Sequence, residues 1–301
     1  MDNRRIGILD NIKQTFKQGS SLTKLIYINA SVFVLLKLTL ILFLLFNISG
    51  SFILTYLAVP ADLTQLVYRV WTPLTYMFLH EGLLHIFFNM FTLFWFGRIF
   101  LMYFSEKQLV GLYLVGGLLA ALLYVVAFNL FPYYASTLHQ SILLGASGSI
   151  MAIIVATAFH SPNMELQVLF LGNVKLKYIA IFFVLTSLFG ITSNNGGGEL
   201  AHLGGALAGY LFVVSLRQGK DLTKGVSWIL NGIFNLFGPR KLKVKQNRSR
   251  RNSTMTDAEF NVNKARKMVD IDRILDKIKT SGYESLSTEE KKRLFEQGKK
   301  N

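Results

Sequence analysis

The sequence contains no cysteine, and this absence excludes disulfide frameworks, cysteine-based zinc sites and a thiol nucleophile. Charged residues are also scarce, because they make up 16% of the 301 residues, whereas a soluble domain carries roughly 25%. Acidic residues are rarer than basic residues, with 17 Asp and Glu against 32 Lys and Arg. These shortages disfavour an ordinary cytosolic enzyme.

Apolar residues fill the middle of the chain, and basic residues are concentrated at its two ends. Of the 32 Lys and Arg, 21 lie from Arg217 onward and five lie before Leu25, so that six remain for the 192 residues between. This distribution is typical of a membrane protein with basic ends. We expect no nucleic-acid partner, because no aromatic residue interleaves the basic run 241–251.

Six charge-poor segments predict membrane-spanning helices. The hydrocarbon core of a bilayer is about 30 Å thick and a helix rises 1.5 Å per residue, so a crossing helix needs about 20 apolar residues. The first segment either runs over about 25–46 with Lys37 inside or starts after Lys37 and ends by 57. The sequence therefore predicts an all-α membrane protein with a six-transmembrane-helix bundle, whose other spans lie at about 80–100, 109–130, 144–160, 176–192 and 200–216.

The positions of the basic residues predict the orientation. With the N-terminus in the cytoplasm, the outer loops hold Arg69 alone, whereas the opposite orientation puts nearly every cation outside. We therefore predict that both termini are cytoplasmic, and that no signal peptide is removed. The expected parts are a cytoplasmic N-terminal segment (1–24), the six-helix domain (25–217) and a basic cytoplasmic tail (218–301).

The tail contains three recognisable stretches. Residues 226–237 are apolar but too short to cross a bilayer, which favours an interfacial helix. The basic run 241–251 is typical of a linker near anionic lipid. Beyond it, a helical apolar stripe stops at Ser281-Gly282, and the pair Ser287 and Glu290 fits a capping box for a second helix. No partner of this helical hairpin can be read from the sequence.

Four polar residues stand inside the apolar segments, namely His85, Asn89, Ser147 and His202. Polar groups inside a membrane are costly, so they are functional candidates by default. His85, Ser147 and His202 lie 13, 14 and 15 residues before the inner ends of their segments, which all run from outside to inside. At 1.5 Å per residue the three side chains share one level, about 20–22 Å above the inner boundary.

Small residues predict close approach of the helices that carry the serine and the second histidine. One ridge is formed by Gly148, Ala152 and Ala156, and the other by Ala201, Gly205 and Gly209. Such small-xxx-small spacing lets helix backbones pack tightly. His202 should then reach the helix of Ser147, and a Ser–His pair within hydrogen-bond reach is the minimal activated nucleophile.

An acyl transfer also needs donors for the developing oxyanion. The side chains of His85 and Asn89 and the backbone N–H of Ser147, near a helix N-terminus, lie at the required level. We find no acid that orients His202, because Glu199 is expected on the outer loop, so a dyad is predicted. The loop 193–198 ends in three glycines and is expected to move as a cap over the site.

Simpler interpretations exist for each residue taken alone. An intramembrane serine often bonds back to its own helix, and an intramembrane histidine can bond between helices or serve a proton path. His80, His85 and His202 could bind a metal, but no carboxylate or cysteine joins them and Asn is a poor zinc ligand. We therefore expect neither a metal nor a cofactor, and the agreement of four residues on three helices favours catalysis.

Three motifs resemble those of the rhomboid family of intramembrane serine proteases. They are His80-x4-His85-x3-Asn89, Gly145-x-Ser147-Gly148 and Ala201-His202-x2-Gly205-x3-Gly209, and the similarity covers about residues 25–217. The resemblance implies hydrolysis of peptide bonds in or near transmembrane segments of membrane protein substrates within the lipid bilayer. It assigns Ser147 as nucleophile, His202 as general base, His85, Asn89 and the Ser147 backbone as the oxyanion site, and His80 and the motif glycines as supporting residues.

The sequence departs from the family pattern at two places. Many rhomboids have Trp-Arg in the first outer loop, whereas here Trp71 is followed by threonine and the arginine stands at 69. An aromatic residue often packs on the base from four positions after the nucleophile, and here that position is Met151. The tail looks like the helical extension of a subset of bacterial rhomboids, which favours a bacterial plasma (inner) membrane as the location.

Two other classes of function compete with the protease. A catalytically silent relative would bind transmembrane helices as an adaptor or chaperone, but such proteins lose the serine or the histidine, and this sequence keeps both. A transporter or channel would need broken helices or a continuous polar path. The polar groups here stop near one depth, so the protease is the preferred hypothesis.

Overall fold

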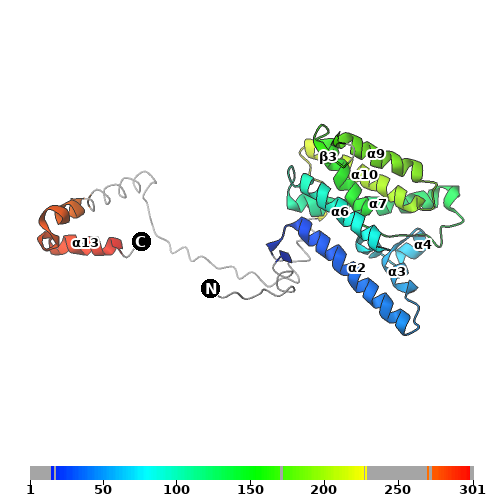
Figure 1. Ribbon diagram of the computed structural model, residues 1–301, viewed down its shortest axis with the longest axis horizontal. Coiled ribbons are helices and arrows are strands. Elements are labelled where there is room, and N and C mark those ends of the chain that lie inside the picture. Colours follow the sequence, from blue (N-terminus) through cyan, green and yellow to red (C-terminus); the bar gives the residue numbers. More distant parts are fainter. Residues whose placement is uncertain are drawn as a thin grey trace. The chain divides into compact units, whose positions relative to one another are not determined.

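The computed structural model describes residues 15–16, 18–169, 172–226, 228, 270 and 273–298. The chain divides into two units, residues 1–239 and 240–301, and each is described by itself. The first unit is a bundle of helices (Figure 1). The predicted linker at 241–251 and most of the predicted interfacial helix at 226–237 lie outside the described residues.

Apolar helices occur at each of the six places where the sequence predicts a span. Within the described part of the chain, four of the six have the length and hydropathy of a membrane-crossing helix, namely α2, α6, α7 and α10. Helices α8 and α9, with 14 and 15 residues, are shorter. The bounds are α2 (Ser21–Leu45), α6 (Leu83–Phe100), α7 (Glu106–Leu130), α8 (Ser147–His160), α9 (Leu176–Gly190) and α10 (Gly196–Arg217).

Helix α2 runs through Lys37 without a break, which decides between the two placements of the first span. The Lys37 ammonium donates a hydrogen bond of 2.7 Å to the backbone carbonyl of Glu81, just before α6. The same ammonium lies 5.7 Å from the centre of the Phe33 ring. A cation in an apolar helix is tolerated when such partners replace water, and here the bond ties α2 to the entry of α6.

Short elements connect the long helices. Between α2 and α6 lie α3 (Ser51–Leu57), β1 (Val59–Pro60), α4 (Leu63–Val67), α5 (Thr72–Thr75) and η1 (Tyr76–Phe78). Between α7 and α8 lie η2 (Pro132–Tyr134) and β2 (Ile142–Leu143), and between α8 and α9 lie β3 (Glu165–Val168) and β4 (Gly172–Lys175). Strand β1 pairs antiparallel with β2, with Val59 opposite Leu143, and β3 pairs antiparallel with β4.

Helix α10 packs against both α7 and α8, and α8 also contacts α6. Glycines permit this closeness. A β carbon at Gly204 of α10 would lie 2.7 Å from the Cα of Ala120 on α7, so only glycine fits there. Backbones that approach so closely gain dispersion contacts, the main attraction between helices in lipid.

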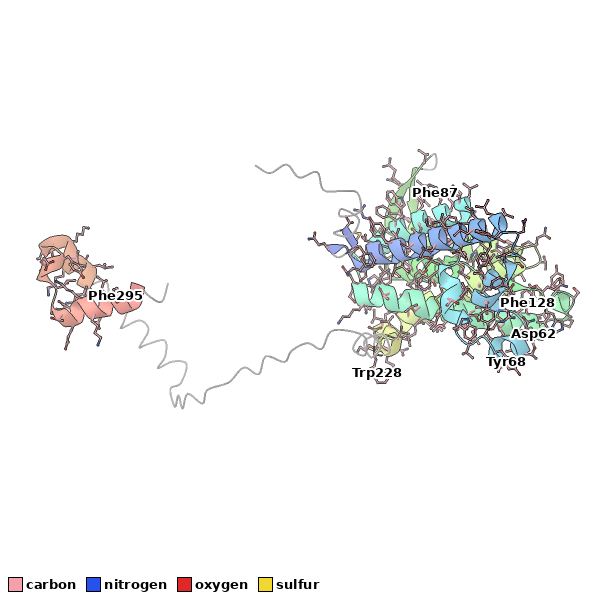
Figure 2. All side chains as sticks on the ribbon, turned by 90° about the horizontal axis from the view of Figure 1, so that it is seen from below. Asp62, Tyr68, Phe87, Phe128, Trp228 and Phe295 are labelled. Carbon is pink, nitrogen blue, oxygen red and sulfur yellow. The ribbon has the colours of Figure 1, made fainter. Side chains whose placement is uncertain are left out.

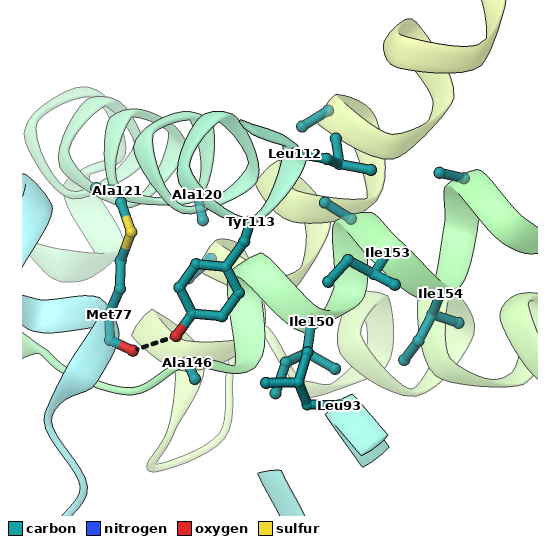
Figure 3. Packing of buried hydrophobic residues seen from close by; sticks show 14 of the residues in the cluster. Met77, Leu93, Leu112, Tyr113, Ala120, Ala121, Ala146, Ile150, Ile153 and Ile154 are labelled. Carbon is teal, nitrogen blue, oxygen red and sulfur yellow. Dashed lines mark hydrogen bonds between the residues drawn. The ribbon is translucent and has the colours of Figure 1, made fainter. Parts of the chain in front are cut away.

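A buried tyrosine links the core to the segment before α6. Tyr113 of α7 is fully buried, and its hydroxyl donates a 2.9 Å hydrogen bond to the carbonyl of Met77 (Figure 3). The side-chain amide of Asn29, on α2, donates to the same hydroxyl at 3.2 Å. A satisfied buried network of this kind fixes the backbone it binds, and here that backbone is η1.

Large apolar side chains remain on the outside of the first unit. Phe87 on α6 is 57% exposed and Tyr68, after α4, is 81% exposed (Figure 2). In the most apolar window of α2, 11% of the residues are buried. Water does not stabilise an apolar surface of this extent, whereas lipid does. The chain is therefore a membrane protein.

The described part of the second unit is a small helical hairpin. Residues 273–281 are helical, and Gly282, with φ of +80°, ends that helix. Helix α13 (Thr288–Gly298) follows the turn η3 (Tyr283–Ser285). The N–H of Ser287 donates to Glu290 Oε2 at 2.7 Å, and the N–H of Glu290 donates to Ser287 Oγ at 3.3 Å, which confirms the predicted capping box.

Candidate active site

A cavity of about 460 Å³ lies among α6, α8, α9 and α10. Its polar lining includes His85 and Asn89 from α6, Ser147 from α8 and His202 from α10. The structure therefore brings together the four polar residues that the sequence places at one depth. Much of the remaining lining is apolar, and includes Phe88, Ile150, Met151, Ile154 and Phe183.

Ser147 is the first residue of α8, and the segment before it is held from two sides. Strand β2 pairs with β1, and the N–H of Gly145 donates to the carbonyl of Tyr76 at 3.0 Å. The amide of Ile150 donates to Ala146 at 3.0 Å and begins the helical ladder, so the Ser147 amide precedes that ladder. An N–H group at a helix N-terminus lies at the positive end of the helix dipole and can donate a hydrogen bond to an anion.

Gly145 has a backbone that favours glycine and stands between two site residues. Its φ is +124°, and a β carbon added there would lie 3.2 Å from Nε2 of His85 and 3.8 Å from Oγ of Ser147. A side chain at this position would therefore fill the space between the imidazole and the hydroxyl. The left-handed backbone and the close ring both require glycine.

The predicted close approach of α8 and α10 is confirmed. A β carbon at Gly148 would lie 3.3 Å from the carbonyl oxygen of Ala201, which precedes His202. One at Gly205 would collide with the backbone carbonyl of Gly148, and one at Gly209 with that of Ala152. These contacts bring the backbones of Ser147 and His202 alongside each other.

Asn89 and Met151 complete the cavity wall near these residues. Asn89 is 8% exposed, and within the described residues its amide makes no hydrogen bond, so its N–H groups are free to meet a ligand in the cavity. Met151 is buried and lines the same cavity as His202. A thioether tolerates contact with an imidazole through its soft sulfur.

The imidazole of His202 is held on its Nδ1 edge. Nδ1 lies 3.1 Å from Oγ of Ser187 on α9 and 3.2 Å from Oε2 of Glu199. Across the described part of the chain, no hydrogen bond joins the ring to Ser147. Hydrogen bonds between a nucleophile and its base are often long in the absence of a ligand, so a shared cavity without a direct bond is compatible with a Ser–His pair.

The expectation that no acid orients His202 is wrong. Helix α10 begins at Gly196, four residues before the predicted start, so Glu199 lies on the helix and not on the outer loop. Residues three apart share a helix face, and this spacing brings the carboxylate to the ring. The signal in the sequence was Glu-x-x-His, whereas nothing in the sequence singled out Ser187.

Comparison with known proteins decides the family. Residues 67–219 match the family described as the Rhomboid domain, which is half of the chain. The chain belongs to the rhomboid family. A second match covers residues 254–300, within the tail, and is to a family of unknown function, DUF6576.

A relative in Arabidopsis thaliana, named RHOMBOID-like protein 12, mitochondrial, is 29% identical to this rhomboid over 164 residues. The match covers 50% of the present chain and 48% of the relative. The chain therefore spans about half the length of the curated relative that it matches.

The glycine-rich loop of this rhomboid differs from the expectation. Gly196, Gly197 and Gly198 form the first turn of α10, so the loop after α9 is shorter than predicted. A β carbon at Gly197 would lie 2.8 Å from the ring of Tyr124 on α7. These glycines therefore serve close packing, which overrides their low helix propensity.

Hydrogen bonds to backbone carbonyls hold the segment between α2 and α6 of this rhomboid, which lacks a Trp-Arg pair. Arg69 donates to the carbonyl of Thr55 at 2.9 Å, and the indole of Trp71 donates to the carbonyl of Tyr56 at 2.9 Å.

His80 is fully buried, and its ring centre lies 5.2 Å from that of His85. Within the described residues, no cluster of three metal-binding side chains occurs.

Proposed function

We propose that the protein is a serine endopeptidase that hydrolyses peptide bonds in or near transmembrane helices of membrane proteins. One observation carries the proposal, namely the cavity that Ser147, His202, His85 and Asn89 line together from three helices. Membership of the rhomboid family supports it. In this proposal Ser147 is the nucleophile, His202 is the general base, and His85 and Asn89 are oxyanion donors.

The reaction would proceed through an acyl-enzyme. Ser147 Oγ attacks the carbonyl carbon of the scissile bond while its proton passes to Nε2 of His202. His202 then returns that proton to the leaving amine nitrogen as the C–N bond breaks. A water molecule gives a proton to His202 and attacks the ester, which releases the carboxylic acid and restores the Ser147 hydroxyl.

Three donors would stabilise the oxyanion of each tetrahedral intermediate. They are the amide of Asn89, a ring N–H of His85 and the backbone N–H of Ser147 at the start of α8. Donors aimed at the developing charge in a site of low dielectric are the largest contribution in such reactions. Gly145 serves this arrangement by leaving room between His85 and Ser147, and Gly148, Gly205 and Gly209 serve it through helix packing.

The proposed topology has six spans with both termini in the cytoplasm. The domain boundaries are proposed as 1–24, 25–217 and 218–301. Arg98 and Arg217 lie in the last turns of α6 and α10, which the positive-inside rule assigns to the cytoplasmic side. Helix α8, with 14 residues, is about 21 Å long. If its last turn meets the inner boundary, Ser147 lies roughly 10 Å below the outer one.

The depth of the nucleophile constrains the substrate. A carbonyl inside an intact helix is hydrogen-bonded and shielded, so the substrate helix must unwind before attack. Unwinding costs least where glycine, polar residues or a nearby proline weaken the helix. We therefore expect cleavage beside a small residue near the outer end of the substrate helix.

The proposed location is the plasma (inner) membrane of a bacterium. The tail favours it, because its helical hairpin looks like the extension of a subset of bacterial rhomboids. The name of the Arabidopsis relative places that protein in mitochondria. Cell fractionation with markers for each membrane distinguishes the two locations.

A cleavage assay in liposomes tests the proposal. The full chain is reconstituted with a model transmembrane helix that carries small residues and then glycines near its outer end, and the cut is mapped by mass spectrometry. We expect a cut near that end with the wild type and none with Ser147→Ala. A matched helix with leucines in place of the weakening glycines should be protected.

Three results would contradict the proposal. A cut at the cytoplasmic end would oppose the assigned topology. Equal cleavage by Ser147→Ala and rapid cleavage of the leucine version would each oppose the mechanism. Binding of the helix without any cleavage would favour the silent adaptor.

A further inference from the structure

The ring of His202 contacts Glu199 on α10 and Ser187 on α9. Neither residue has a role in the proposed reaction. Nδ1 lies 3.2 Å from Oε2 of Glu199, one turn earlier on α10, and 3.1 Å from Oγ of Ser187 on α9. Both partners meet the same nitrogen. The opposite nitrogen, Nε2, has no hydrogen-bond partner among the described residues.

The chemistry of the partners selects one tautomer. An ionised carboxylate only accepts hydrogen bonds, so the contact with Glu199 requires a hydrogen on Nδ1. In a neutral imidazole the other nitrogen then has a free lone pair. Because His202 and Ser147 line the same cavity, that free Nε2 is the nitrogen available to take the serine proton.

The packing around Glu199 shows that its position is built into the fold. A β carbon at Gly190, the last residue of α9, would lie 2.8 Å from Cγ of Glu199, so the glycine leaves room for the glutamate side chain. Ser187 is 1% exposed, whereas the side chains of Glu199 and His202 are 21% and 22% exposed. The pair is thus shielded from solvent over most of its surface.

We propose that Glu199, together with Ser187, positions the His202 ring for catalysis and stabilises its protonated form during each proton transfer. This inference rests on the proposed function of the site. Among the described residues the carboxylate contacts the His202 ring and makes no hydrogen bond to Ser147, so the role proposed for Glu199 is that of a positioning residue. The arrangement then resembles a triad in its roles, with Ser187 as an additional partner of the ring.

Isosteric variants test the role of Glu199. Glu199→Gln keeps the volume that Gly190 accommodates but removes the charge, so we expect kcat to fall roughly 10–100-fold with KM little changed. The effect should be smaller than the loss in a fully buried triad, because Ser187 remains on the ring. Glu199→Asp should recover part of the rate, and Ser187→Ala should lower kcat by a smaller factor than Glu199→Gln.

The matched control is Glu165→Gln, which makes the same chemical change at an exposed position of β3. It should leave kcat and the melting temperature unchanged. The second readout is the rate of labelling of Ser147 by a fluorophosphonate probe, because this reports the activated serine without substrate binding. We expect the labelling rate of Glu199→Gln to fall together with kcat while the melting curve stays close to that of the wild type.

Wild-type kcat and labelling in folded Glu199→Gln would overturn the inference. The inference would also be overturned if kcat and melting temperature fell together in Glu199→Gln and if Glu199→Asp lost as much kcat as Glu199→Gln. That result would indicate a purely structural role for Glu199. The proposed function fails by a different result, which is activity that survives Ser147→Ala. The two failures are therefore distinguishable in one set of variants.

Discussion

Gly205 of α10 faces the backbone carbonyl of Gly148 on α8 so closely that no side chain fits between them. Ser147 directly precedes Gly148 on α8, and His202 lies three residues before Gly205 on α10. The distance between the two backbones therefore sets the distance between the proposed nucleophile and its base.

We expect Gly205→Ala to separate α8 from α10 and to lower both stability and activity. The added methyl group would collide with a main-chain atom, which cannot rotate away, so the cost should reach or exceed the about 1–3 kcal/mol of an overpacked core. Thermal melting in detergent measures it. Gly225→Ala is the matched control, because a β carbon there meets nothing within 4 Å. Equal melting temperatures for the two variants would contradict the packing account.

Ser147 and His202 should act as one unit. Each single alanine variant should lose nearly all hydrolysis, and the double variant should lose little more, because either change alone stops the same proton transfer. Rates from wild type, both single variants and the double variant test this expectation. Additive losses would show that the two side chains act independently.

His85 and Asn89 should affect the rate and not the fold. If each donates to the oxyanion, each alanine variant should lower kcat by roughly 10²–10³ at most, with an unchanged melting temperature. Kinetics and melting curves of the same preparations separate the alternatives. A loss of stability in proportion to the loss of rate would show that the residues only pack α6 against its neighbours.

Asp62 should make stability depend on pH in acid. Hydrogen bonds, first from the Thr64 hydroxyl and then from His139, lower the pKa of Asp62 from 3.8 to about 2. Because the folded state holds this carboxylate ionised, its stabilisation is complete above pH 4 and is lost as the pH falls toward 2. Melting temperatures measured from pH 5 to pH 2 test this.

In Asp62→Asn the part of the acid dependence that belongs to this carboxyl should disappear. The asparagine keeps the size of the side chain and an acceptor for Thr64, so that the variant should fold. An identical acid dependence in Asp62→Asn and wild type would show that the Asp62 carboxylate contributes nothing to stability.

Hydropathy predicted where the long helices lie, because length and apolar content decide a span almost alone. It could not predict the start of α10. Three successive glycines are poor helix formers in isolation, yet Gly197 packs against the ring of Tyr124 and lies in the helix. Because α10 begins at Gly196, Glu199 lies on the same helix face as His202 and contacts its ring, so the expected dyad has an acid beside its base.

The grouping of His85, Asn89, Ser147 and His202 could be predicted from the sequence, since residue counts along three helices that run in the same direction fix the relative heights of their side chains. Lateral placement needed the structure. Ser187 is one serine in an apolar helix, and no spacing in the sequence relates α9 to the ring of His202. The short elements between α2 and α6 also carry no periodic signal, because none of them exceeds two turns.

Labelling of the full chain with a fluorophosphonate probe in detergent, followed by mass spectrometry of the adduct, shows whether Ser147 is an activated nucleophile. We predict an adduct on Ser147, no labelling of Ser147→Ala or His202→Ala, and normal labelling of Ser149→Ala, whose hydroxyl is buried outside the cavity. An adduct elsewhere, or equal labelling of Ser147→Ala, would contradict the claim that Ser147 is an activated nucleophile.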